Sequence, residues 1–149
     1  MKIQLLILSS LFTLSSFSQN EKRLKNFNIE NKIAIQGYDP VAYFKQKKAI
    51  KGKKELSFSY EGVIYNFSNK DNKEVFTKTP AIYEPQYGGW CAYAMGSSSD
   101  KVEIDPETFK IIDNKLYLFY NAYFNNTLKS WNKDEKQLKM KADLNWKKY

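Results

Sequence analysis

The chain has 149 residues, of which 42% are hydrophobic, and its 24 basic and 16 acidic side chains give a formal charge of +8. This length predicts one compact domain, plus whatever is removed in processing. A single cysteine and no histidine exclude an internal disulfide and a Cys–His hydrolase, and they disfavour a closed zinc site.

Residues 1–18 have the pattern of a cleaved signal peptide. Lys2 supplies a basic start, residues 3–14 form a mostly apolar run, and residues 16–18 place serines at the two positions that a signal peptidase reads. We expect cleavage before Gln19 and export to the periplasm or the medium. The apolar run is too short to span a bilayer as a stable helix, and no cysteine follows the cleavage site, so no membrane anchor is expected.

A polar lead-in, residues 19–32, follows and is expected to be mobile. The domain itself is expected to occupy residues 33–149. Residues 33–35 form a short strand candidate, and Gly37-Tyr38-Asp39-Pro40 is a turn in which the proline fixes φ.

Much of the positive charge lies in the next connection, in lysines 45, 47, 48, 51, 53 and 54. Such a cluster suits nucleic acid or an anionic polymer. Export argues against nucleic acid, and no aromatic residue lies among these lysines to stack on bases. We therefore interpret the cluster as a solvated basic loop and expect no nucleic-acid partner.

Two hairpins are indicated by alternating hydrophobic residues. The first joins residues 56–60 to 63–67 around Glu61-Gly62, and the second joins residues 109–112 to 116–120 around Asp113-Asn114.

The helices are indicated by capping residues and by spacing. Ser68 and Asp71 form a capping box that opens a helix through Phe76, and Pro80 starts one further turn. Near the end, apolar residues at steps of three and four predict an amphipathic helix lying on the sheet, interrupted near Lys133-Asp134. These residues are Phe124, Leu128, Trp131, Leu138 and Ala142.

Together these elements predict an α+β domain. Its two β-hairpins form a small antiparallel sheet, packed with a central short helix and the C-terminal amphipathic helix.

The stretch 86–96 concentrates the unusual chemistry of the chain. It holds three of the six glycines, the only cysteine and a methionine four residues after it. Paired glycines allow positive φ and close approach, so they fix how the following side chains are presented. Alanines after the cysteine favour a short helix, in which residues 91 and 95 share one face.

Several segments resemble the exported YHS-domain family, and together they extend from about Ile33 to Trp146. The segments are Gly37-Tyr38-Asp39-Pro40-Val41-Ala42-Tyr43-Phe44, residues 83–94, residues 112–118 and residues 141–146. YHS domains also occur in copper-transporting ATPases and in phenol and toluene monooxygenase components. The resemblance therefore implies metal binding.

Two positions bear on what that resemblance implies. Some members of the exported branch carry selenocysteine at the position matching Cys91, which implies redox or soft-metal chemistry there. Asn66 stands where the histidine that names the family is expected. A metal site that used this imidazole would lack that ligand in this chain.

The first hypothesis for function is a soft-metal site. Thiolate and thioether ligands favour copper(I), and Cys91 and Met95 supply one of each. A third ligand would come from Met140, a second molecule or a small thiol, although Met95 also suits a role as core filler. The carboxylates Asp39, Asp100, Glu103 and Asp105 have no recognisable calcium-loop spacing.

Three alternatives stay open. Cys91 at a helix start would act as an attacking thiolate in thiol redox or peroxide chemistry, although no resolving cysteine is present. A small planar or apolar ligand would bind a cleft at Tyr87, Gly88, Gly89, Trp90 and Tyr93, without catalysis. The third is a purely structural or interaction domain with the thiol sealed in its core.

Overall fold

The computed structural model describes residues 18–149, so the predicted signal peptide lies outside the described residues except for Ser18. The described chain starts in a helix, residues 18–26. Among the described helices, none combines the length and the apolar character needed to cross a bilayer. After the first helix the elements in chain order are β1 (Ile29–Glu30), β2 (Ile33–Ala34), η1 (Ile35–Gly37), α2 (Ala42–Lys45), β3 (Lys53–Tyr60), β4 (Val63–Phe67), α3 (Lys70–Lys78), α4 (Pro80–Tyr83), η2 (Gln86–Gly89), α5 (Ala92–Ser97), β5 (Asp105–Ile112), β6 (Lys115–Phe119), β7 (Asn121–Ala122), β8 (Asn125–Asn126), α6 (Thr127–Trp131) and α7 (Glu135–Trp146).

The larger sheet contains the first predicted hairpin. Its strand order is β1-β2-β4-β3, and β3 and β4 pair antiparallel with Tyr60 opposite Val63. Between them Glu61 and Gly62 both take positive φ, which is the geometry of a tight hairpin turn. The other edge of β4 pairs in parallel with β2.

The second predicted hairpin is β5–β6, with Ile112 opposite Lys115 and positive φ at Asp113 and Asn114. The α+β class is confirmed, but the two hairpins do not share one sheet. β5 and β6 form a two-stranded sheet of their own, and β7 and β8 form another. One reason is that β2 already occupies the edge of β4 on which a second hairpin would add.

Helix α3 starts one residue later than the predicted capping box. Its cap is Asn69, whose side chain accepts from the Asn72 N–H at 2.8 Å. Ser68 instead donates both its N–H and its hydroxyl to Asp39, at 2.8 and 2.6 Å. The following turn, α4, begins at Pro80 as expected.

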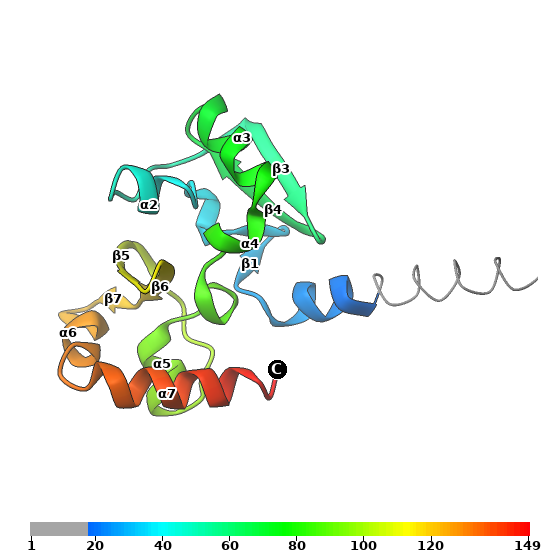
Figure 1. The fold of residues 1–149 in the computed structure, drawn as a ribbon. Helices are drawn as coiled ribbons and strands as arrows, with labels where there is room; N and C mark the ends of the chain where they lie inside the picture. Colours follow the sequence, from blue (N-terminus) through cyan, green and yellow to red (C-terminus); the bar gives the residue numbers. More distant parts are fainter. Residues whose placement is uncertain (1–17) are drawn as a thin grey trace, which may run out of the picture.

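The C-terminal helical region is divided into α6 and α7, which confirms the predicted interruption near Asp134. It does not lie on the sheet: α7 packs along α5, at the base of the molecule in Figure 1. Contact is so close that a Cβ on Gly96 would lie 2.5 Å from the Leu138 carbonyl oxygen. Phe124, predicted to belong to this helix, is instead exposed in the turn between β7 and β8.

The lead-in also differs from its prediction as a mobile segment. Residues 18–26 form a helix, and β1 pairs with β2. Leu24 and Phe27 pack against the core, which accounts for this order. The strand predicted at residues 33–35 ends at Ala34, because Ile35 takes φ 51° and opens η1.

The core has two clusters of buried side chains. One is built mainly by β4, α2, α3 and the start of β6, and it includes Tyr65, Phe67 and Phe76. The other lies among β6, α5, α6 and α7, and it includes Tyr117 and Trp131. The stretch 86–96 contributes residues to both clusters.

Candidate functional site

The glycines of the stretch 86–96 form a left-handed turn. In η2, Tyr87, Gly88 and Gly89 have φ of 55°, 60° and 87°. A Cβ on Gly88 would lie 2.8 Å from Phe27 Cδ1 and 2.9 Å from Trp146 Cη2. Only glycine therefore allows these two rings to approach the turn.

Cys91 follows this turn and is completely buried. It is the cap residue of α5, and its Sγ lies 3.3 Å from the Tyr120 N–H nitrogen and 3.4 Å from Thr127 Oγ1. The Thr127 hydroxyl donates to the Tyr120 carbonyl at 2.8 Å. Because the Thr127 hydroxyl proton is used in that bond, the Cys91 thiol is the donor in its contact with Thr127 Oγ1. It accepts from the Tyr120 N–H, and both contacts suit a neutral thiol.

The second predicted soft ligand, Met95, is also completely buried, but its side chain belongs to the other core cluster. Met140, the candidate third ligand, is 57% exposed on α7. No group of three or more cysteine, aspartate or glutamate side chains suited to a metal ion occurs within residues 18–149. The described contacts thus place each of the three sulfurs in a different environment.

The aromatic side chains of the motif are tied to the rest of the chain. The Tyr87 hydroxyl donates to Asp143 at 2.9 Å, and burial together with that carboxylate raises the pKa of Tyr87. The Trp90 indole donates to the Asn26 carbonyl at 2.7 Å. Tyr93 is half-buried and packs against both core clusters.

The lead-in occupies the face of the turn where the sequence predicts an open cleft. Asn28 donates its N–H to the Gly88 carbonyl at 2.8 Å and its side-chain amide to the Gly89 carbonyl at 3.2 Å. Phe27 lies against Gly88. Residues 26–28 therefore cover η2 on this side.

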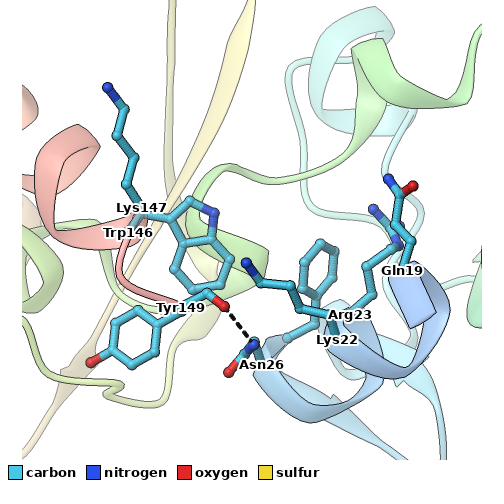
Figure 2. A pocket seen from close by; sticks show the side chains of 8 residues that line it. Gln19, Lys22, Arg23, Asn26, Trp146, Lys147 and Tyr149 are labelled. Carbon is cyan, nitrogen blue, oxygen red and sulfur yellow. Dashed lines mark hydrogen bonds between the residues drawn. The ribbon is translucent and has the colours of Figure 1, made fainter. Parts of the chain in front are cut away.

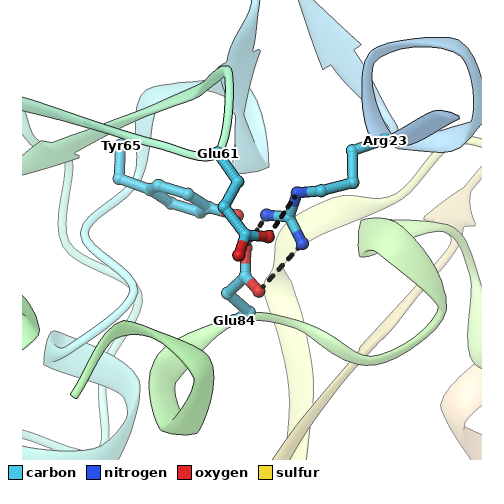
Figure 3. A network of polar contacts seen from close by, with 4 residues as sticks. All are labelled: Arg23, Glu61, Tyr65 and Glu84. Atoms are coloured by element: carbon cyan, nitrogen blue, oxygen red, sulfur yellow. Dashed lines mark hydrogen bonds and ion pairs between the residues drawn. The ribbon is translucent and has the colours of Figure 1, made fainter. Parts of the chain in front are cut away.

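Arg23, the only arginine in the sequence, holds the first helix onto the sheet. Its guanidinium pairs with both Glu84 oxygens, and its Nε lies 3.3 Å from Glu61, as Figure 3 shows. The Tyr65 hydroxyl also donates to Glu84. Burial opposes the charge of Arg23, but the hydrogen bond and the charge of Glu84 outweigh it and raise the pKa of Arg23. Burial, then Glu84, raises the pKa of Tyr65 well above its ordinary value.

A hollow of about 290 Å³ lies between this helix and the end of α7 (Figure 2). We call it the helix-end hollow. The side chains that line it are Gln19, Lys22, Arg23, Asn26, Phe27, Trp146, Lys147 and Tyr149.

Its walls are aromatic and its rim is cationic. Trp146 lies between Phe27 and Tyr149, with ring centroids 6.1 and 5.6 Å away. Asn26 donates to the Tyr149 main-chain oxygen at 2.9 Å and so fixes one side. Lys22 and Lys147 form no ion pair with residues 18–149.

Phe27, Trp146 and Lys147 also line an adjoining hollow of about 480 Å³, which reaches Tyr87 and Gly88. Two residues of the glycine–aromatic motif, Tyr87 and Gly88, therefore line a hollow that shares Phe27 and Trp146 with the helix-end hollow. The residues that sequence analysis missed are those of the lead-in and the chain end. The lone arginine and Phe27 within the polar lead-in were the available signals.

Two of the carboxylates considered for a hard cation, Asp39 and Asp105, accept hydrogen bonds from other residues of the chain. Asp39 is completely buried and accepts five hydrogen bonds, from Val41, Ala42, Ser68 (two) and Asn72, at 2.6–3.3 Å. Asp105 accepts from the Thr108 hydroxyl at 2.7 Å. The bond from Asn72 to Asp39 ties the Gly37–Phe44 motif to α3, which is a structural role.

Comparison of the chain with protein-family models, with curated proteins and with solved structures gives no match. The likeness to the YHS family therefore stays a prediction from the sequence motifs.

Proposed function

We propose that the protein is an exported, non-enzymatic binding module of the YHS type, and that it holds a small planar anion in the helix-end hollow. The observation that carries the proposal is the combination of three half-buried aromatic rings with two lysines that form no ion pair within residues 18–149. Aromatic walls favour a flat ligand, and ammonium groups at the rim favour a carboxylate or a similar anion.

The surrounding contacts support a preformed site. Arg23 is held by Glu84 and Glu61, so the helix that carries Lys22, with Phe27 directly after it, is fixed against the sheet. Lys101 donates to Asn26 at 2.9 Å and lies 4.3 Å from the Tyr149 ring centroid, which supports the opposite wall. A ligand that enters a fixed site does not have to order its walls, so less binding free energy is lost.

A soft-metal function is less well supported. The two sulfurs that the sequence pairs belong to different core clusters, and the thiol of Cys91 already has two polar neighbours. Copper(I) binding would therefore require the core to rearrange.

The test compares three probes of one shape: 2-naphthoate, neutral 2-naphthalenemethanol and cationic 2-naphthylmethylamine. Binding is measured by tryptophan fluorescence, with Trp146→Phe to identify the signal. We expect the anion to bind most tightly and the amine most weakly.

Charge variants give the matched control. Lys147→Glu should raise the Kd for 2-naphthoate about five- to tenfold, since a favourable exposed charge pair becomes a repulsive one. Lys136→Glu makes the same change on α7 outside this hollow, and it should leave the Kd within about twofold. Equal binding of the three probes, or equal effects of the two variants, would contradict the proposal.

A further inference from the structure

A second hollow, of about 460 Å³, lies beside η1 on the larger sheet, and no residue lines both it and the helix-end hollow. We call it the η1 hollow. Its lining side chains and glycines are Glu30, Asn31, Ile33, Gln36, Gly37, Lys51, Gly52, Lys54 and Asn66.

Asn66 is the buried polar group of this hollow. The residue is only 5% exposed, and its side-chain amide makes no hydrogen bond to any residue within 18–149. Within residues 18–149 the buried side-chain polar atoms without a partner are Arg23 Nε and the Tyr117 hydroxyl, so the Asn66 amide is open to solvent at the hollow. Because Asn66 lines the hollow, a bound polar group would reach its amide there.

Two glycines shape the space around this amide. Gly52 crosses over the Asn66 backbone so closely that a Cβ would lie 2.5 Å from the Asn66 carbonyl carbon and oxygen. Gly37 has φ 80°, and a Cβ there would lie 3.3 Å from Asn66 Nδ2 and 3.7 Å from Lys51 Nζ. A side chain at Gly37 would fill the space in front of the amide and the ammonium group, and one at Gly52 would push the Asn66 backbone away.

The charges in the η1 hollow favour an anion. Lys51 Nζ donates to the Gln36 carbonyl and lies 4.7 Å from the Tyr38 ring centroid, which holds the ammonium in place. Lys54 supplies a second positive charge. The acidic lining residue, Glu30, also lines a neighbouring hollow that contains Glu103, so the η1 hollow itself has two lysines and one carboxylate.

From this geometry we propose that the η1 hollow is a second binding site, which takes a small oxyanion such as phosphate or a carboxylate. Asn66 donates from its side-chain amide, and Lys51 and Lys54 supply the balancing charge. Amide and ammonium donors together match the several acceptor oxygens of such an anion. The site is independent of the proposed function of the helix-end hollow.

The test is a titration of the ¹⁵N-labelled protein with sodium phosphate, followed by NMR at constant ionic strength. We expect saturable shifts at Gly37, Gly52 and the Asn66 side-chain amide, and none when chloride replaces phosphate. Acetate in place of phosphate distinguishes the two sources: tighter phosphate binding indicates a phosphoryl ligand, and tighter acetate binding indicates a carboxylate. Shifts that never saturate and spread over all the lysines would overturn the proposal, because they indicate screening alone.

Two variants and one control make the result specific. Asn66→Asp places a negative charge against the anion and should weaken binding at least about tenfold. Asn114→Asp makes the same change in the exposed β5–β6 turn and should leave affinity within about twofold. Lys51→Gln, expected to weaken binding about fivefold, tests the proposal even if Asn66→Asp fails to fold. Equal affinity in all three variants would overturn it.

Discussion

The turns η1 and η2 have nearly the same backbone and lie in very different surroundings. Each ends in a glycine with φ of 80–87°, preceded by two residues in the left-handed region: Ile35 and Gln36 in η1, and Tyr87 and Gly88 in η2. Tyr38 and Trp90 follow with almost identical extended conformations, φ −77° and −78°. The next residues are the buried Asp39 and Cys91, and each precedes a short helix.

The difference lies in what covers each turn. The lead-in packs on η2 through Phe27 and Asn28, whereas η1 borders a hollow that Asn66 and Lys51 line. A non-glycine residue at positive φ is strained by about 1–3 kcal/mol. At η2 the strained turn is covered by another part of the chain. At η1 the strained turn borders the η1 hollow.

The largest expected effect comes from the two buried residues that follow the turns. Asp39→Ala leaves several buried donors without an acceptor and should lower the free energy of unfolding by about 4 kcal/mol. Cys91→Ala mainly leaves a small cavity and should cost about 2 kcal/mol. Urea denaturation measures both, and equal losses would mean that the two positions have equivalent roles.

The next prediction tests the cover over η2. Gly88→Ala should destabilise the protein by about 3 kcal/mol, because the methyl group meets Phe27 and Trp146 as well as adding backbone strain. Gly89→Ala has a similar φ but its nearest contact would be 3.4 Å, so it should cost about 1 kcal/mol. Gly37→Ala at η1 should resemble Gly89→Ala in stability. A Gly88→Ala variant as stable as the other two would show that the lead-in does not pack on the turn in solution.

The third prediction concerns the thiol beyond η2. Cys91 is completely buried, so alkylation at neutral pH should be at least about a hundredfold slower than in urea-unfolded protein. A Ser97→Cys variant in a Cys91→Ser background presents an exposed thiol on the same helix and should react quickly. Fast reaction of native Cys91 would instead favour the thiol-redox hypothesis, and protection by copper(I) would favour the soft-metal one.

Local sequence signals predict much of the fold and little of the packing around the site. Turn chemistry at Glu61-Gly62 and Asp113-Asn114 places both hairpins, and Pro80 places the start of α4. These signals involve residues that are close together in the sequence, so they can be recognised without the structure.

What the sequence misses depends on contacts between distant residues. Serine is a common helix-capping residue, but the N–H and the hydroxyl of Ser68 donate to Asp39. Asn69 therefore caps α3 instead. Likewise, the polar composition of the lead-in suggests that it does not pack, yet Arg23 forms an ion pair with Glu84 and Phe27 packs against Gly88. Spacing cannot reveal such partners. It does place Cys91 and Met95 one helical turn apart, where the Met95 N–H donates to the Cys91 carbonyl at 3.0 Å, but it cannot show that their side chains enter different clusters.

The smallest expected effects come from the tyrosines beside each turn. Tyr43, in the helix after η1, donates to the Pro106 carbonyl at 2.9 Å, so Tyr43→Phe should cost about 1 kcal/mol. Tyr117, which packs against Tyr87 of η2, has a buried hydroxyl without a partner in residues 18–149. Tyr117→Phe should therefore be neutral or stabilising by up to about 1 kcal/mol.

The same pair of tyrosines gives a pH dependence with a definite sign. Burial, then the charges of Asp143, Asp113 and Glu135, raises the pKa of Tyr117 to about 12, and burial also raises the pKa of Tyr43. Because an unfolded tyrosine ionises near pH 10, their contribution to stability is complete below that pH. It is lost as the pH rises toward 12 and above. Urea denaturation between pH 9 and about 11.5 should show this fall, and Tyr117→Phe should reduce its slope; an unchanged slope would mean that the Tyr117 hydroxyl is solvated in the folded protein.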